Sequence, residues 1–209
     1  MSICKPRPTV FTESPTISVT ASGTSWESRV HHIHRALLEG QSMTFCRKLT
    51  NRCNKSVRIT VGPDVRERDF GCFVTWLYNR EIPEDEVVPR FCYLWQLAIL
   101  LESQNFKSYL EVRGKACLRG SDYLFPVATG LLELLFDDDA ITHRELYEYL
   151  IQGLADKINA DGWVRFITKT DGGWEHFMNH KDDKNGTKGK VLSMLMERLD
   201  KGHQENMQA

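Results

Sequence analysis

The sequence predicts an α+β protein in which a small β-sheet is flanked by a cluster of α-helices, with an additional α-helical C-terminal region. Three observations lead to this fold class. Apolar and polar residues alternate over 16–20 and again over 57–61, as expected of half-buried strands. Apolar residues recur with helical spacing from Phe70 onward. Beyond Lys107 only helical patterns follow.

The composition favours a globular protein and excludes several functional classes. Of the 209 residues, 41% are hydrophobic and 10% are aromatic, which is enough for a packed core. The net charge of -1 argues against direct binding of nucleic acid, which needs a basic excess to displace counterions. No run of about 18 apolar residues could span a membrane. No apolar block follows the first residues, so we expect no secretory signal.

The six cysteines are scattered along the chain, and none forms the C-x-x-C pair that usually marks a zinc site. Disulfide frameworks are typical of small secreted domains, which this chain does not resemble. We therefore expect reduced, mostly buried thiols and no cofactor. We also expect an intracellular protein, located in the cytoplasm, the nucleus or both.

The first predicted element is a β-hairpin. Residues 1–14 have little apolar periodicity and are expected to be a flexible N-terminal segment. The alternating strand at 16–20 is followed by a turn signal at 21–25 and by a second extended run near 26–33.

Two short helices and a third strand come next. The run from His34 to Leu38 begins a helix that Gly40 can end with a left-handed cap. Ser42 is a good N-cap for the second short helix. After a polar, basic loop, the run 57–61 alternates and stops at a Gly-Pro pair, so it is predicted to be a strand.

Two stronger helices follow this strand. Apolar residues at i, i+3, i+4 and i+7 form one face of the first helix: Phe70, Phe73, Val74 and Leu77. Residues 81–89 are predicted to be an acidic, proline-bounded loop. The second helix spans about 89–103 and is apolar nearly all round, which is typical of a helix in the centre of a domain.

The rest of the chain is predicted to be mainly helical, with loops at 171–173 and 180–190. Pro126 can stand at a helix start. The residues Thr142-His143-Arg144-Glu145 form a capping box, and the helix that it opens ends at Asp161-Gly162. A last amphipathic helix covers 191–199.

A few polar clusters could carry chemistry. His31, His32 and His34 lie close together, but neighbouring strand residues point to opposite faces, so a shared metal is not expected. His176 and His180 have the i, i+4 spacing of zinc-binding helices, yet the general-base Glu of H-E-x-x-H is missing. We interpret the acidic run 137–139 as a favourable helix start rather than as a cation site.

Several loose motifs occur in a fixed order along the first half of the chain. They are His34-Arg35-Ala36-Leu37-Leu38, Ser42-Met43-Thr44-Phe45, Val57-Arg58-Ile59, Phe70-x-x-Phe73-x-x-Trp76-Leu77-Tyr78 and Leu94-Trp95-Gln96-Leu97-Ala98. Together they resemble the H-x-x-L-L…S-x-x-F signature, strand, F-x-x-F-L-x-W-L-Y-T-G helix and L-x-x-L-A helix of the BTB/POZ domain. Asn79-Arg80 stand where that family usually has Thr-Gly.

The later part of the chain also resembles a known arrangement. In short fungal BTB proteins a helical extension follows the domain, with segments similar to Tyr123-Leu124-Phe125-Pro126 and Trp174-Glu175-His176-Phe177. The resemblance implies a BTB/POZ domain over 15–118 and a helical C-terminal extension over 119–209.

The resemblance implies a protein–protein interaction module or adaptor rather than an enzyme. In this family the first strand and first helix commonly build a homodimer, which makes Ile17, Val19, Leu37 and Leu38 the dimer-interface candidates. Family members also bind cullin scaffolds of ubiquitin ligases through a region that corresponds to Phe45, Leu49 and Tyr78, the partner-binding candidates.

The loop after the second short helix departs from the cullin-binding pattern. It lacks the hydrophobic-x-Glu sequence and carries Lys48, Arg52 and Lys55 instead. A basic patch where an acidic contact is expected disfavours a cullin partner. Two other functions stay open: recruitment of transcriptional complexes through a BTB dimer, and a small metal-dependent or Cys/His enzyme using His176 and His180.

Overall fold

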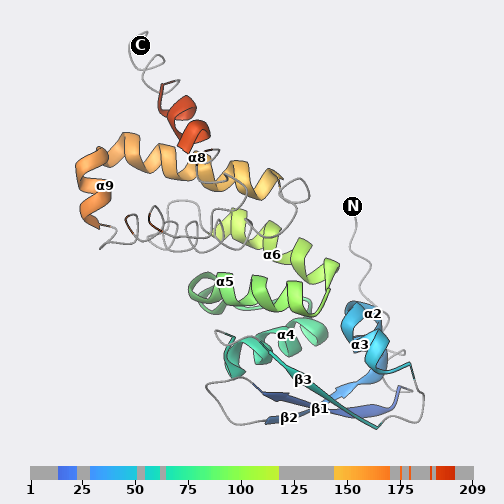
Figure 1. The fold of residues 1–209 in the computed structure, drawn as a ribbon. Coiled ribbons are helices and arrows are strands. Elements are labelled where there is room, and N and C mark those ends of the chain that lie inside the picture. The colour runs from blue at the N-terminus through green and yellow to red at the C-terminus, as the bar shows by residue number, and fades with distance from the viewer. Residues whose placement is uncertain are drawn as a thin grey trace. The chain divides into compact units, whose positions relative to one another are not determined.

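The computed structural model describes residues 14–22, 29–50, 55–61, 65–117, 144–169 and 192–200, together with Glu175, Asn179 and Gly189. The chain divides into two compact units, Met1–Gly114 and Lys115–Ala209. The fold is mixed α/β and mostly helical, with one small sheet (Figure 1).

The elements in chain order are β1 (Thr16–Ser22), β2 (Arg29–His34), α2 (Arg35–Gln41), α3 (Met43–Lys48), β3 (Ser56–Thr60), α4 (Glu67–Asn79), α5 (Glu84–Leu100), α6 (Gln104–Cys117), α8 (Arg144–Asp161) and α9 (Trp163–Lys169). Residues 192–200 are also helical.

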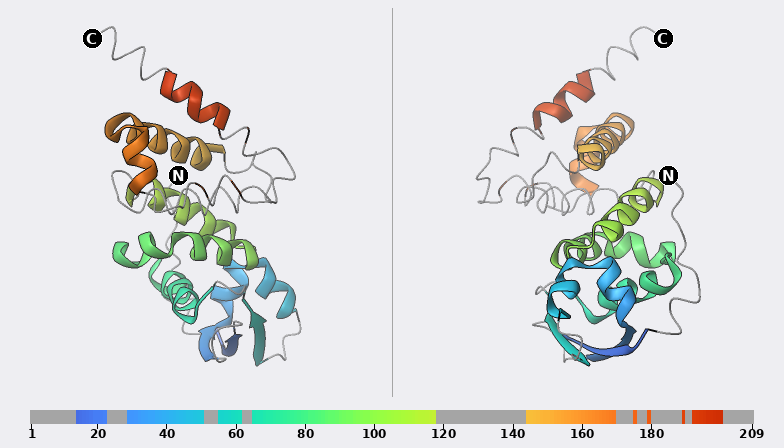
Figure 2. Two further views of the ribbon diagram at one scale, coloured as in Figure 1. Left: turned by 60° about the vertical axis from the view of Figure 1, so that its left-hand side comes forward. Right: turned by 90° about the vertical axis from the view of Figure 1, so that its right-hand side faces the viewer.

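The three strands form one sheet with the order β2-β1-β3. The central strand β1 pairs antiparallel with β2 and parallel with β3, so that Val19 lies opposite both His31 and Val57. Every second residue of β1 is buried. The helices of the first unit lie over the same face of the sheet, and α4 packs against β1 (Figures 1 and 2).

The predicted hairpin is confirmed, but its first strand is longer than expected. Ala21 and Ser22 pair with neighbouring strands and so are not part of the turn. The reason is that Ala21 occupies a buried position on the same face as Val19. Its burial in the strand outweighs the tendency of the neighbouring residues to form a turn. The connection at 23–28 lies outside the described residues.

Both short helices form, and Ser42 is their shared boundary. It caps α3 by accepting a hydrogen bond from the Phe45 amide, as predicted. Gly40, in contrast, does not end α2 in a left-handed turn, because the helix continues to Gln41 and Ser42 follows in an extended conformation. The immediate start of α3 sets the end of α2.

Helix α4 forms over the predicted apolar face. The carboxylate of Asp69 accepts a hydrogen bond from the Arg66 amide at 2.7 Å and so closes the helix start. At the other end Arg80 adopts a left-handed conformation with φ 58°, and its amide donates to the Trp76 carbonyl at 2.8 Å.

The prediction of a loop over 81–89 is wrong from residue 84 onward. Helix α5 already begins at Glu84, after Pro83, and Pro89 lies inside it. The three acidic residues 84–86 occupy the first turn, where negative charge is favoured by the helix dipole. Pro89 removes one early intrahelical hydrogen bond, which burial of the apolar helix outweighs.

Aromatic side chains dominate the core of the first unit. Its largest fully buried side chains are Trp95, Phe45, Phe70, Phe73, Phe91, Phe106, Ile33, Leu38, Leu49, Leu77 and Ile82. Helix α6 packs closely against α5 at Gly114, where an added Cβ would lie 2.5 Å from two ring atoms of Phe91.

The described part of the second unit is helical. Helix α8 ends at Asp161 as predicted, and Gly162 follows with φ +78° and donates its amide to the Ile158 carbonyl. Tyr149 donates its hydroxyl proton to the Lys115 carbonyl at 2.6 Å. The expected helix at Pro126 and the cap residue Thr142 lie outside the described residues.

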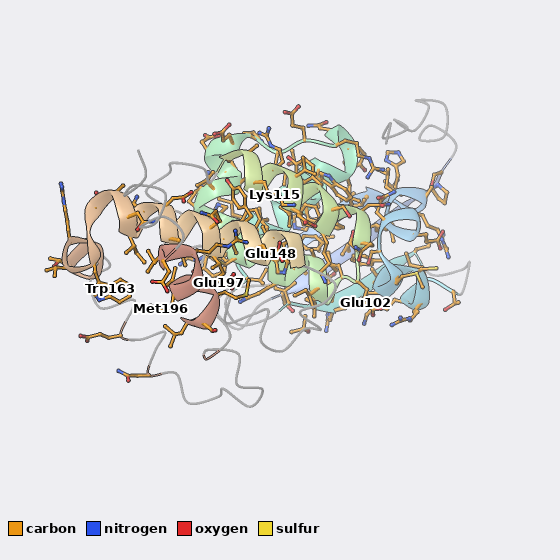
Figure 3. The ribbon with its side chains drawn as sticks, turned by 90° about the horizontal axis from the view of Figure 1, so that it is seen from above. Glu102, Lys115, Glu148, Trp163, Met196 and Glu197 are labelled. Atoms are coloured by element: carbon orange, nitrogen blue, oxygen red, sulfur yellow. The ribbon has the colours of Figure 1, made fainter. Side chains whose placement is uncertain are left out.

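The helix expected at 191–199 is confirmed over its described residues, and α9 was not predicted from sequence. In this unit Trp163 and Met196 are exposed apolar residues (Figure 3), and Val164 is exposed as well. Within the described ranges, no helix combines the length and the apolar character needed to cross a membrane.

Candidate functional site

The predicted partner-binding residues differ in exposure. Phe45 and Leu49 are completely buried, on and just after α3, whereas Tyr78 near the end of α4 keeps 40% of its surface exposed. Within this chain, Phe45 and Leu49 therefore belong to the core and hold α3 in position beneath its exposed side. A partner that docks without unfolding the domain would contact their exposed neighbours.

The four dimer-interface candidates also lie in the core of this chain. Ile17 and Val19 point from β1 into the interior, and Leu37 and Leu38 are the buried residues of α2. They join the hairpin to the helices of the first unit, which accounts for their apolar character without a second copy.

Tyr78 is fixed to the junction of β2 and α2. Its hydroxyl accepts a hydrogen bond from the His34 amide at 3.1 Å and lies 2.9 Å from Nδ1 of the same residue. The two rings also meet edge-on, with centroids 5.8 Å apart. The exposed part of Tyr78 is therefore held in one orientation.

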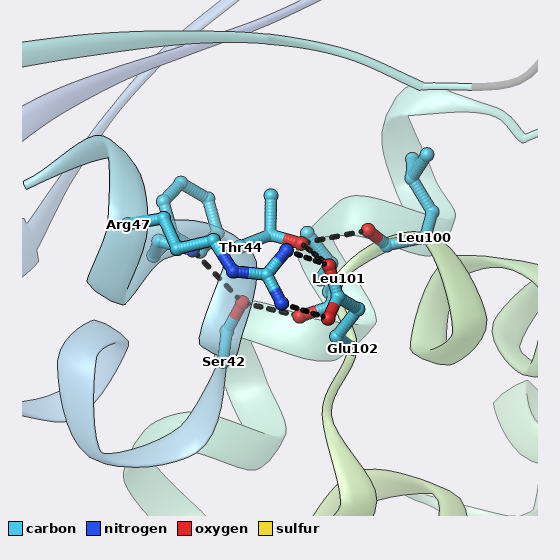
Figure 4. Close-up of polar contacts among 7 residues, drawn as sticks. Ser42, Thr44, Arg47, Leu100, Leu101 and Glu102 are labelled. Atoms are coloured by element: carbon cyan, nitrogen blue, oxygen red, sulfur yellow. Dashed lines mark hydrogen bonds and ion pairs between the residues drawn. The ribbon is translucent and has the colours of Figure 1, made fainter.

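Several side-chain hydrogen bonds join the start of α3 to the end of α5. We call this region the α3–α5 junction, and it comprises Ser42, Met43, Thr44, Arg47, Leu100, Leu101 and Glu102. The Ser42 hydroxyl donates to the Leu101 carbonyl, and the Thr44 hydroxyl donates to the Leu100 carbonyl at 3.0 Å (Figure 4). Segments that are far apart in sequence are thus joined by side-chain to backbone bonds.

Glu102 holds the junction together from the α5 side. Its backbone is left-handed, with φ 47°, at a position where glycine is favoured. Its amide donates to the Ile99 carbonyl and the Ser103 amide donates to the Ala98 carbonyl, which together form a Schellman motif. Its carboxylate accepts two hydrogen bonds from Arg47, at 2.6 and 2.7 Å (Figure 4).

Two exposed apolar side chains belong to this junction. Met43 is 54% exposed at the first position of α3, and Leu100 is 38% exposed at the last position of α5. Met43 and the buried Phe45 lie on the same helix α3. Two residues along a helix correspond to about 200° of rotation, which places them on opposite sides.

A second polar cluster joins α4 to α5 and has a structural role. Asp69 is fully buried and accepts a hydrogen bond from Arg90 at 2.8 Å. Arg90 also pairs with Glu86, and Arg68 binds the same carboxylate. The hydrogen bond from Arg68 lowers the pKa of Glu86. These charges pair with one another and link α4 to α5.

The described cysteines differ in burial. Burial raises the pKa of the Cys72 thiol to about 11, so this thiol stays protonated at neutral pH. Cys46 is exposed, which corrects the expectation of mostly buried thiols for that residue, and Cys92 and Cys117 are partly buried. All four are free, whereas Cys4 and Cys53 lie outside the described residues.

The histidines of β2 do not gather around a metal position. The Nε2 atom of His31 is buried without a hydrogen-bond partner, and burial lowers the pKa of this side chain. His32 faces Ser18 at 3.3 Å, and His34 faces Tyr78. Over the described ranges, no three His, Cys, Asp or Glu side chains form a cluster that could hold a metal ion.

The other chemical candidates from sequence cannot be placed. His176, His180 and the acidic run 137–139 lie outside the described residues. Comparison with protein-family models and with curated proteins finds no match for this chain. The candidate site therefore rests on the geometry of the α3–α5 junction.

Proposed function

We propose that this chain is a protein–protein interaction module, an adaptor of the BTB/POZ type. The observation that carries the proposal is the α3–α5 junction, a rigid exposed surface that presents Met43 and Leu100 beside a charged pair. Exposed apolar side chains that cluster together are typical of surfaces that bind other proteins, whereas single ones occur on any protein surface.

The order of elements supports the BTB/POZ assignment. A hairpin, two short helices, a parallel strand and two long helices follow one another in the sequence expected from the motifs. Arg80 adds a residue-level argument, because it is left-handed at the position where the family usually has glycine. Left-handed backbone is the reason for a glycine preference at such a position.

The partner surface that we propose combines Met43, Leu100 and Tyr78. Phe45 and Leu49 contribute by positioning α3, since both are buried beneath it. A cullin scaffold is a disfavoured partner, because the segment after α3 is basic where an acidic residue is expected. Self-association through β1 and α2 requires a contact other than the side chains of Leu37 and Leu38, which the core already uses.

The experiment compares partner capture by the full chain and by surface variants. The double variant Met43→Glu and Leu100→Glu places charges on the junction, and Val112→Glu is the matched control on another exposed apolar position of the same unit. We expect the wild type and the control to capture the same proteins from the native host. The double variant is expected to lose these proteins. Circular dichroism and thermal unfolding verify that all variants stay folded.

Equal capture by the wild type and the double variant would contradict the proposed surface. Light scattering on the same samples measures self-association. Stoichiometric zinc in the purified protein would instead favour the alternative, a small metal-dependent enzyme using His176 and His180.

A further inference from the structure

Among the described strands, none pairs with the outer edge of β3. The sheet order β2-β1-β3 places β3 at an edge. The Ser18 amide donates to the Lys55 carbonyl at 3.0 Å, and the Val61 amide donates to the Ser22 carbonyl at 2.9 Å. In a parallel ladder, these two bonds fix which residues of β3 face β1, and the residues between them face away.

Three residues of β3 therefore direct backbone groups outward. The register pairs Ser18 with Ser56, Thr20 with Arg58 and Ser22 with Thr60. The amides and carbonyls of Ser56, Arg58 and Thr60 point away from β1, and no described strand pairs with them. Their side chains are exposed as well, so this edge can receive a peptide backbone.

The described charged side chains at this edge are basic. Between Glu39 and Asp64 the sequence has five basic residues and no acidic one, although Arg47 is paired with Glu102. Two of the five, Lys55 and Arg58, are exposed at the edge, and the neighbouring residues of β1 are the uncharged Ser18, Thr20 and Ser22. In the described part of the chain neither Lys55 nor Arg58 takes part in an ion pair.

We infer that the β3 edge binds an extended acidic segment of a partner protein by strand addition. The backbone of that segment would pair with Ser56, Arg58 and Thr60, and its carboxylates would lie near Lys55 and Arg58. This inference rests on the proposed function, since it names the chemistry of one partner segment. It uses a different surface from the α3–α5 junction.

Two other occupants fit the edge less well. A second copy pairing through its own β3 would bring cationic edges together, and like charges opposite one another destabilise a strand pair. Nucleic acid would satisfy the cations but would leave the outward amides and carbonyls without strand partners. The other sheet edge is less accessible, because the Tyr78 hydroxyl already occupies the His34 amide of β2.

The first test uses the full chain and a fluorescein-labelled peptide of eight alternating glutamate and valine residues. Fluorescence anisotropy is expected to show binding that weakens as salt rises. Arg58→Glu is expected to weaken binding by about tenfold or more. Arg29→Glu, on the opposite edge of the same sheet, is the matched control and is expected to change binding by less than about twofold. Should Arg58→Glu fail to fold, Lys55→Glu takes its place.

The second test separates strand pairing from simple charge attraction. Thr60→Pro removes one outward amide without removing a bond to β1, and Thr60→Val is its control because it keeps the amide. Thr60→Pro is expected to weaken binding several-fold and Thr60→Val to leave it unchanged. A peptide of the same sequence with alternate amides N-methylated is expected not to bind.

Three results would overturn the inference. In the first, the N-methylated peptide binds as tightly as the unmethylated one. In the second, a 20-nucleotide oligo-dT displaces the labelled peptide as well as unlabelled peptide does. In the third, the wild type does not bind the peptide. Loss of captured proteins with the Met43→Glu and Leu100→Glu variant reports on the proposed function alone. The two proposals therefore fail separately.

Discussion

Arg80 and Glu102 show how single charged residues end the two central helices of the first unit. Both have left-handed backbone, with φ 58° and 47°. The guanidinium of Arg80 lies over the Trp76 ring at 4.9 Å, and the carboxylate of Glu102 holds Arg47. Each side chain thus makes a contact within the first unit, and this contact offsets part of the energetic cost of the left-handed backbone.

Substitutions at Glu102 separate backbone strain from the ion pair. Both Glu102→Ala and Glu102→Gly lose the contact with Arg47, but only glycine adopts positive φ without strain. We expect the Gly variant to be more stable than the Ala variant by about 1 kcal/mol. Urea unfolding of the two variants and the wild type measures this difference. Equal stability of the two variants would show that the backbone at this position is unstrained.

At Gly114, an added methyl group is expected to have a large effect on stability. An added Cβ would lie 2.5 Å from Cε2 and Cζ of the buried Phe91 ring. We expect Gly114→Ala to lower the free energy of unfolding by about 1–3 kcal/mol, because a packed core resists overfilling. Chemical denaturation checks this value. Gly71→Ala is the control: a Cβ there meets nothing within 4 Å, so the variant is expected to be neutral or more stable.

His31 makes stability depend on pH. Burial lowers the pKa of this histidine, so its neutral form is favoured in the folded state. The unfolded state then binds more protons between the lowered pKa and the ordinary value of 6.5, and stability rises with pH through that range. The contribution of neutral His31 to folding stability is complete above about pH 6.5 and is lost as pH falls through the lowered pKa.

The measurement is the urea midpoint between about pH 5 and pH 8. We expect His31→Gln to flatten the pH dependence and the exposed His32→Gln to keep it. A wild-type midpoint that does not fall on acidification would contradict this assignment.

At the scale of elements, the local patterns predicted most of the fold and missed features that depend on packing. Strand alternation located β1 and β3, and the apolar face of α4 was found from its spacing. The start of α5 was missed because prolines and acids are usual in loops. Here Pro83 precedes the helix, the acidic residues are favoured in its first turn, and burial of the helix outweighs the cost of Pro89 inside it. The extra α9 lacks a sequence signal long enough to detect.

The candidate site could be predicted only in part, for a physical reason. Tyr78 was identified from its motif and is exposed, but Phe45 and Leu49 are buried. The sequence shows that a residue is apolar, but it does not show whether that residue is buried in the core or exposed on the surface. The α3–α5 junction depends on bonds such as that from Ser42 to Leu101, across 59 positions, which no local pattern reveals.

Ser42 tests whether this junction also stabilises the elements that it joins. Its hydroxyl caps α3 and donates to the Leu101 carbonyl at a buried position. We expect Ser42→Ala to lower the free energy of unfolding by about 1–2 kcal/mol. Thr44→Ala, which loses an exposed bond to Leu100, is expected to cost less. Thermal and urea unfolding rank the two variants. The reverse order would contradict the capping role of Ser42.

At the scale of the molecule, the first unit has the core of an independent domain. Among the described residues of the whole chain, the largest fully buried side chains all belong to the first unit. We expect a chain ending at Leu118, which keeps all of α6, to unfold in one cooperative transition. Circular dichroism and tryptophan fluorescence should give coincident curves. A broad or non-coincident transition would show that the first unit requires the rest of the chain.

During synthesis, β1 leaves the ribosome well before the strand that completes its second side. The segment between Ser22 and Ser56 must first be translated, which takes about 2–7 s at ordinary rates of elongation. Over this interval the nascent hairpin of β1 and β2 exposes one ladder of amides and carbonyls. A chaperone that shields this ladder, or rapid docking of α2 and α3, would protect the growing chain from aggregation.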